Sequence, residues 1–258
     1  MDKIKVTAVS YLNTKPLLYG ILNSEIADQI DLHLDIPSVC AKKLNSGEAD
    51  LGLIPVAAIP ELANPEIISS FCIGTNGSVK TVCIYGQCPI EEMESIYLDF
   101  HSRTSVELTR LLLRDYWKLN PELIPASPGY IDQIKDKKGG LVIGDRTIGL
   151  DQKYPFVYDL GETWKAHTGL PFVFAAWVSN RPLPESFING FNEAMKKGVM
   201  AIPELILIIP EQEFDLEHYF THNISYELDM KKRESLTIFL NSITGGVLPE
   251  TTKNSLVC

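Results

Sequence analysis

Short apolar runs of strand length alternate along the chain with longer stretches in which apolar residues recur every three or four positions. The short runs predict β-strands at 4–9, 32–36, 50–54, 67–73, 79–85, 96–98, 141–143 and 172–178. The longer stretches predict helices at 37–47, 102–119, 131–135, 184–200 and 229–243. A further helix is expected to begin near 15–16. Because strands alternate with helices, the pattern indicates an α/β protein with mostly parallel sheets.

The series of strands and helices restarts after Pro89, and helices alone follow the strand at 172–178. This arrangement predicts two lobes, each a mostly parallel sheet flanked by helices. Lobe I would comprise residues 1–86 and 178–258, and lobe II residues 87–177. In such sheets a ligand binds beyond the carboxyl ends of the strands, so we expect a substrate cleft between the lobes and functional residues in the turns that end strands.

The run from Asp99 to Ser105 is one such turn and opens an amphipathic helix. Hydroxyl side chains at a helix start cap main-chain N–H groups, and the remaining N–H groups with the helix dipole form a site for a carboxylate. A simple helix cap would also explain Ser102 and Thr104. The other strand-end turns are Ser10–Asn13, Pro55, Gly77–Ser78 and Gly144–Asp145.

Several hydroxyl-bearing turns directed at one cleft suit a small anion. Thr104 with Ser105 could hold one carboxylate and Ser78 another, each charge-assisted bond contributing about 1.5–3 kcal/mol. Asn13 could orient a hydroxyl group or only stabilise its own turn. Arg103 could pair with an anion or with a neighbouring acidic side chain.

Two residues have both a functional and a structural interpretation. Asp145 follows a strand and a glycine, so its carboxyl group could act as a general base with a raised pKa or bind arginine and main-chain N–H groups. Phe172 lies in the alternating stretch at 171–177, where it could face the cleft or belong to the core.

Composition narrows the class of protein. The 258 residues carry a net charge of −10 and no cluster of Lys and Arg, which argues against nucleic acid and anionic membranes as partners. The N-terminus shows no signal-peptide pattern, so we expect a cytoplasmic location. The five cysteines lack C-x-x-C spacing and the histidines lack metal-binding spacing, so we expect reduced thiols, at most one of them catalytic, and no metal.

Several segments together resemble the chorismate dehydratase family of the futalosine route to menaquinone. The resemblance extends from about residue 4 to about 242, and its segments occur in the family's order. They are V-S-Y-L-N-T-K-P-L (9–17), G-E-A-D-L-G-L-I-P (47–55), G-S-V (77–79), S-R-T-S (102–105), I-G-D-R (143–146), D-L-G-E-T-W (159–164) and T-G-L-P-F-V-F-A-A-W (168–177).

This resemblance implies a type 2 periplasmic-binding-protein-like fold that serves as a cytosolic enzyme. It implies a hydro-lyase that removes water from chorismate to give 3-[(1-carboxyvinyl)oxy]benzoate without a metal or organic cofactor. Asn13 would hold the leaving hydroxyl or the enolpyruvyl carboxylate, and the base would be Asp145 or that substrate carboxylate. We expect substrate contacts from Ser10, Tyr11, Pro55, Ser78, Ser102, Arg103, Thr104, Ser105, Gly144 and Phe172.

Three alternatives share this fold. One is the 1,4-dihydroxy-6-naphthoate synthase of the same pathway, which the S-R-T-S and T-G-L-P-F-V-F-A-x-W forms disfavour. Another is a non-catalytic receptor for a small anion, which would need a signal peptide. The third is the effector domain of a transcription regulator, for which we expect a preceding helix-turn-helix region.

Overall fold

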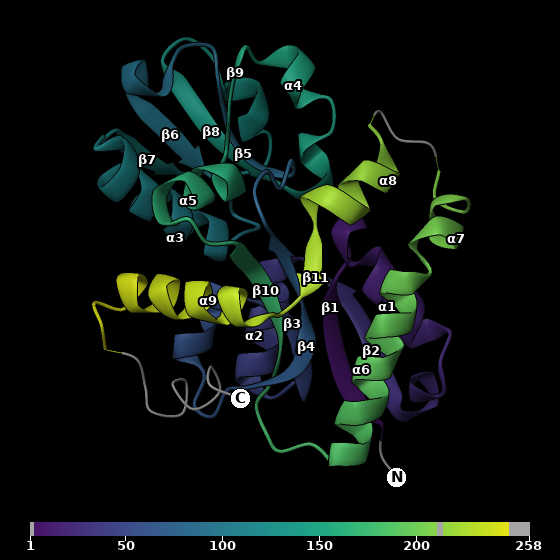
Figure 1. Ribbon diagram of the computed structural model, residues 1–258. Helices are drawn as coiled ribbons and strands as arrows, with labels where there is room; N and C mark the ends of the chain where they lie inside the picture. Colours follow the sequence, from purple (N-terminus) through teal and green to yellow (C-terminus); the bar gives the residue numbers. More distant parts are fainter. Residues whose placement is uncertain (1–2, 211–213, 248–258) are drawn as a thin grey trace.

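Two β-sheets form the framework of the computed structural model, which describes residues 3–210 and 214–247 (Figure 1). The first sheet has the order β11-β4-β10-β3-β1-β2 and consists of β1 (Ile4–Val9), β2 (Ile30–Asp35), β3 (Leu51–Pro55), β4 (Glu66–Thr75), β10 (Phe172–Ser179) and β11 (Ser225–Glu227). The second has the order β7-β6-β8-β5-β9 and consists of β5 (Val82–Gly86), β6 (Ser95–Leu98), β7 (Glu122–Pro125), β8 (Lys138–Ile143) and β9 (Phe156–Asp159).

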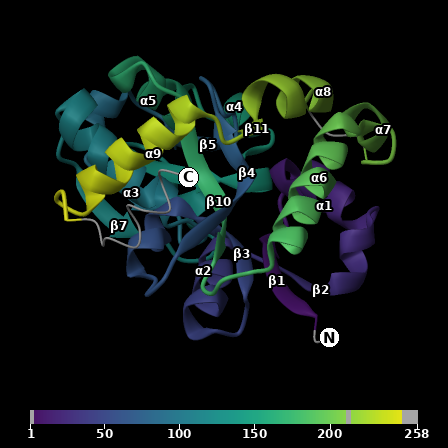
Figure 2. The same cartoon turned by 60° about the horizontal axis from the view of Figure 1, so that its bottom comes forward.

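Helices cover both faces of the first sheet (Figures 1 and 2). The α-helices of the described residues are α1 (Lys15–Leu22), α2 (Pro37–Ser46), α3 (Thr104–Leu112), α4 (Leu150–Lys153), α5 (Leu160–Thr168), α6 (Glu185–Met200), α7 (Ile202–Ile206), α8 (Leu216–His218) and α9 (Met230–Ile243). Side chains of β10 alternate between the faces. Trp177 packs on Phe191 of α6, whereas Phe172 packs on Phe239 of α9.

Helices α1 and α6 pack so closely that glycine is required at their contact. A Cβ atom at Gly20 would collide with the main-chain oxygen of Ala194, and one at Gly198 with that of Pro16. Helix α1 begins directly after the turn at residues 10–14, so its packing against α6 restrains the end of that turn.

The predicted two-lobed α/β architecture is confirmed, but the sheets are more mixed than we expected. Strands β1, β2 and β3 pair in parallel, and so do β6, β7 and β8. Strand β10 runs antiparallel to both of its neighbours, and so does β5. Each of these two strands is the first strand after the chain has passed from one sheet to the other. Each runs opposite to the strands beside it.

The sheets also differ from the predicted lobe boundaries. Strand β5 belongs to the second sheet, whereas the boundary at 86/87 placed it in lobe I. Strand β10 belongs to the first sheet, whereas the boundary at 177/178 placed most of it in lobe II. The apolar run at 79–85 is not one strand, because Lys80 has a φ of 65° and breaks it. We propose that the chain crosses between the lobes at 76–81 and again at 169–171.

The predicted strands and long helices are present with small shifts at their ends, and three weakly patterned strands are additional. These are β7, β9 and β11, which have few apolar residues and short lengths. The helix expected at 102–119 is α3 followed by a π-helical segment at Leu113–Trp117, which Lys118 ends with a φ of 58°. The run of predicted helices after 184 also contains the short α7 and α8.

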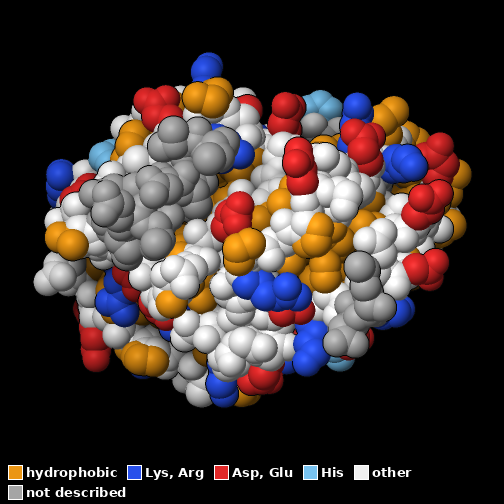
Figure 3. Space-filling view, turned by 90° about the horizontal axis from the view of Figure 1, so that it is seen from below, with side chains coloured by type: hydrophobic (Ala, Val, Ile, Leu, Met, Phe, Trp, Pro, Cys, Tyr) orange, Lys and Arg blue, Asp and Glu red, His pale blue; other side chains and the backbone are white. Residues whose placement is uncertain are grey.

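The surface agrees with the charge pattern of the sequence. On the face seen from below, Lys and Arg side chains lie among Asp and Glu side chains rather than in one basic area (Figure 3). Within the described part of the chain, no helix combines the length and apolar character needed to span a membrane.

Candidate active site

A small cavity lies between the lobes at the ends of β1, β3 and β8 and the start of α3. Its volume is about 50 Å³, well below the roughly 300–1,000 Å³ typical of ligand pockets. Seven predicted site residues line it, namely Tyr11, Asn13, Pro55, Ser102, Thr104, Ser105 and Gly144. Turns distant in sequence therefore converge around one small cavity, as the strand-end rule predicts.

The three hydroxyl groups at the start of α3 have different partners. The Ser102 hydroxyl accepts a hydrogen bond from the Ser105 N–H at 3.0 Å, so Ser102 caps the helix. The Thr104 hydroxyl donates to the Phe174 carbonyl at 3.0 Å and accepts from the Ala57 N–H at 3.2 Å. Thr104 thus joins the two lobes. Among the described residues, no hydrogen bond engages the hydroxyl of Ser105, which remains available to a ligand.

Asn13 lies in a short 3₁₀ helix directly after β1 and lines the cavity. Its side-chain oxygen accepts a hydrogen bond from the Thr14 hydroxyl at 3.2 Å. Its main-chain oxygen accepts one from the Tyr226 hydroxyl at 3.0 Å. Both contacts act on oxygen atoms of Asn13, so the side-chain NH₂ group is the part left to meet a ligand.

Tyr11 closes one side of the cavity against the second lobe. Its hydroxyl lies 2.7 Å from Nδ1 of His101, and the two rings stack. Burial raises the pKa of Tyr11 to about 12, so the phenol keeps its proton and can donate to the neutral imidazole. Gly144 permits the approach, since it has a φ of 66° and a Cβ atom there would lie 2.7 Å from the Tyr11 ring.

A buried carboxylate organises the second lobe behind Tyr11. Asp99 accepts hydrogen bonds from the His101 N–H and the Ile143 N–H, each at 3.0 Å, and from Nη2 of Arg146 at 2.6 Å. Its side chain is 0% exposed and that of Arg146 is 28% exposed. Asp99 therefore joins the end of β8 to the turn after β6, and both segments border the cavity.

Asp145 faces the turn after β1 instead of the cavity. Its two carboxylate oxygens accept from the Leu12 N–H at 3.0 and 3.2 Å. Burial raises the pKa of Asp145, and the bond from Leu12 opposes that change. The carboxylate thus acts as a contact between the lobes in this structure, and its predicted role as base stays a prediction.

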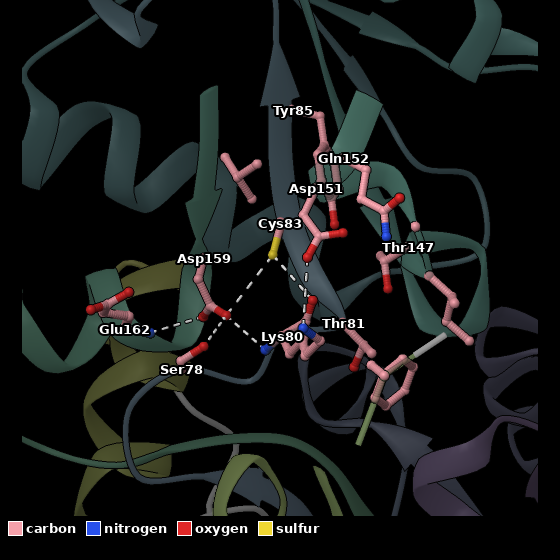
Figure 4. Close-up of a pocket in the computed structure, with 14 residues that line it drawn as sticks. Ser78, Lys80, Thr81, Cys83, Tyr85, Thr147, Asp151, Gln152, Asp159 and Glu162 are labelled. Carbon is pink, nitrogen blue, oxygen red and sulfur yellow. Dashed lines mark hydrogen bonds and ion pairs between the residues drawn. The ribbon is translucent and has the colours of Figure 1, made fainter. Parts of the chain in front are cut away.

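Ser78 opens into a neighbouring pocket of about 250 Å³ (Figure 4). Its hydroxyl donates to Asp159 at 2.8 Å, and Asp159 also accepts from the N–H groups of Val79 and Lys80. Ser78 therefore has no proton left for a substrate carboxylate in this conformation. In the same pocket, burial raises the pKa of Cys83 well above its ordinary value, so its thiol stays protonated and is a weak nucleophile.

Three other predicted contact residues point away from the cavity. Arg103 is exposed and pairs with Glu61 at 2.6 Å, which is the structural alternative considered for it. Ser10 is exposed. Phe172 is 1% exposed and packs against Trp164, Phe174 and Phe239, so it belongs to the core. Their predicted contacts with a substrate lack support in this conformation.

Several cavity residues carry no local sequence signal. Thr14 lies in a 3₁₀ helix, Phe174 in β10 and Thr81 in a bend directly before β5, yet all three line the cavity. The strand-end rule does not select Thr81, because Thr81 precedes the start of β5 rather than following its end. Among residues 3–210 and 214–247, no three His, Cys, Asp or Glu side chains gather in a metal-binding arrangement.

Acidification is expected to destabilise the contact between Tyr11 and His101. Burial and the nearby Arg146 hold the pKa of His101 below its ordinary value of 6.5. The unfolded chain therefore takes up the proton first, and the free energy of unfolding falls as the pH decreases through 6.5. Urea denaturation at about pH 7.5 and about pH 5.5 measures this loss.

The control for this experiment is His101→Gln, whose amide oxygen accepts from Tyr11 without titrating. The wild type should lose more stability on acidification than the variant. Equal losses in both proteins would contradict the role of His101.

Two lobes, each with a mixed sheet, two crossings and a central cavity define an α/β protein of the periplasmic-binding-protein type. Solved structures agree with this class. Protein AF1704 from Archaeoglobus fulgidus matches with a TM-score of 0.71 and 15% identity, covering 95% of this chain and 98% of that one. The Candida albicans CA3427 product, described as having the periplasmic binding protein fold, matches with a TM-score of 0.61 and 11% identity, covering 99% and 95%.

The chain belongs to the menaquinone biosynthesis family, whose model matches residues 4–244. A curated relative is the chorismate dehydratase of Thermus thermophilus. It is 25% identical over 238 residues, which cover 81% of this chain and 84% of the relative.

Proposed function

We propose that this protein is an enzyme, a hydro-lyase that dehydrates chorismate to 3-[(1-carboxyvinyl)oxy]benzoate in menaquinone biosynthesis. The observation that carries the proposal is the convergence of Asn13, Ser105 and the start of α3 on one cavity between the lobes. A family shared with a chorismate dehydratase supports it. Such an enzyme works in the cytoplasm.

Chorismate has two carboxylates and a ring hydroxyl, so its site needs two groups of anion donors and one group that holds the hydroxyl. We assign the ring carboxylate to the Ser105 hydroxyl and the N-terminus of α3, where the helix dipole favours negative charge. The Asn13 amide holds the leaving hydroxyl or the enolpyruvyl carboxylate. Ser78 binds the second carboxylate only after its hydroxyl leaves Asp159.

The reaction breaks one ring C–H bond and the C–O bond to the hydroxyl, and the proton and hydroxide leave as water. The proton lost is vinylogous to the ring carboxylate, so donors at that carboxylate stabilise the charge that develops. Because Asp145 binds Leu12 rather than lining the cavity, we assign proton removal to the enolpyruvyl carboxylate of the substrate. Aromatisation of the ring makes the step strongly favourable.

Substrate entry requires the lobes to separate, since a cavity of about 50 Å³ admits no molecule of this size. Hydrogen bonds between the lobes would break on opening. They include those that join Thr104 to Ala57, Asp145 to Leu12 and Tyr11 to His101. We therefore assign Thr104 to closure of the lobes and Ser105 to the carboxylate.

Incubation of the purified protein with chorismate, followed by mass spectrometry, tests the function. The expected product has lost one water molecule. Unchanged chorismate together with conversion of a cyclic futalosine derivative would instead identify the naphthoate synthase of the same pathway. Binding of chorismate without turnover would identify a receptor.

Asp145→Asn is expected to keep turnover of chorismate within about tenfold of the wild type, because the amide oxygen still accepts from Leu12 and no proton transfer depends on this side chain. Steady-state kinetics measures the effect. A loss of about 10³-fold or more with unchanged stability would make Asp145 the base.

A further inference from the structure

The two hydrogen bonds that Asn13 accepts come from residues outside any predicted site. Tyr226 lies 213 positions away in β11, and its hydroxyl donates to the main-chain oxygen of Asn13 at 3.0 Å. Thr14 is the next residue along the chain, and its hydroxyl donates to the side-chain oxygen at 3.2 Å. The bond from Tyr226 thus holds the peptide unit of Asn13, and the bond from Thr14 holds the rotation of its side-chain amide.

Tyr226 is well suited to hold a fixed contact. Its side chain is 5% exposed, and burial keeps the pKa of its phenol well above the ordinary value, so the hydroxyl remains a donor. Two residues near Tyr226 in the chain form further hydrogen bonds that hold this segment in place. The Asn223 amide donates to the Ser78 carbonyl at 3.0 Å, and the Tyr219 hydroxyl lies 2.9 Å from that of Thr81. The segment 219–226 therefore supports two turns of the cavity from behind.

The contact with Thr14 determines which end of the Asn13 amide meets a ligand. An amide whose oxygen is already bonded to the Thr14 hydroxyl leaves its NH₂ group free to donate to a ligand. That group donates to a hydroxyl or carboxylate oxygen, whereas the opposite orientation would place the amide oxygen against a carboxylate, which has no proton to donate. The enolpyruvyl carboxylate needs a donor, and a donor also stabilises the negative charge on the departing hydroxyl.

We propose that Tyr226 and Thr14 are positioning residues that hold Asn13 as a hydrogen-bond donor toward the substrate. The proposal rests on the function proposed above, in which Asn13 contacts chorismate. Neither residue takes part in proton transfer, and Tyr226 does not line the cavity.

Tyr226→Phe removes only the hydroxyl group and tests the proposal. Because misplacing a reacting group costs turnover more than binding, we expect kcat for chorismate to fall about tenfold or more while KM changes less than about threefold. Tyr154→Phe is the matched control. Tyr154 is equally buried and its hydroxyl also donates to a main-chain oxygen, that of Ile131, remote from the cavity. This control should lose stability but not kcat.

Thr14 is tested with a pair of variants. Thr14→Val keeps the shape of the side chain and removes the donor, so kcat should fall about tenfold, whereas Thr14→Ser should restore it. Adding Tyr226→Phe to Asn13→Ala should then change kcat less than about twofold, because the group being positioned is absent.

The outcomes separate the two proposals. An inactive wild type would defeat the proposed function. In an active wild type, equal kcat values for Tyr226→Phe and Tyr154→Phe, or a full effect of Tyr226→Phe in the Asn13→Ala background, would overturn the positioning role.

Discussion

Replacing Asn13 with alanine is expected to lower kcat for chorismate by about 10²–10³-fold while raising KM less than about tenfold. Asn13 lines the cavity, and a donor at the departing hydroxyl is needed most in the transition state. Steady-state kinetics with mass-spectrometric detection of the product separates the two parameters.

Asn23→Ala is the control for this experiment. Asn23 is exposed at the end of α1, and its amide bonds only to the Tyr19 carbonyl in the described residues, so kcat should stay unchanged. Equal and modest changes in kcat and KM for Asn13→Ala would show that Asn13 only binds the substrate.

Asp99→Ala is expected to lower the free energy of unfolding by about 3–5 kcal/mol. The substitution leaves the partly buried guanidinium of Arg146 without its carboxylate and removes the acceptor of two main-chain N–H groups, those of His101 and Ile143. Denaturation by urea, followed by tryptophan fluorescence, measures the loss.

Asp115→Ala provides the comparison, because Asp115 also pairs with an arginine at 2.6 Å but on the surface. Its removal should cost about 0–1 kcal/mol. Similar losses in the two variants would mean that burial adds nothing to the pair formed by Asp99.

The strand-end rule located much of the candidate site, because it depends on a property that a single sequence reveals. Apolar runs mark the strands, and the polar residues after them, including Asn13 and Ser105, must meet at one edge of a sheet. The rule also selected Ser78, which the structure places in a neighbouring pocket. A positive φ at Lys80 turns the chain there, and no apolar pattern signals that turn.

Hydrogen bonds between segments that lie far apart in the chain could not be predicted from the sequence. Asp159 holds residues about 80 positions earlier in the chain, and a carboxylate at the end of a weakly patterned strand gives no sign of its partners. Asp99 stood inside the most conspicuous turn, yet its role depends on a guanidinium 47 positions later. Hydrogen-bond partners of this kind follow from the tertiary fold and not from hydrophobic periodicity.

The hydrogen bond from Tyr226 to Asn13 can form only after nearly the whole chain has been synthesised, because the two residues lie 213 positions apart. The strands of the second sheet come from one continuous stretch of chain, which can fold while synthesis continues. The first lobe receives β11 only after nearly all of the chain has been made, and contacts between such distant segments form late. A growing chain would therefore hold its strands in place before the turn at Asn13 acquires its support, and catalytic competence would be the last property to arise.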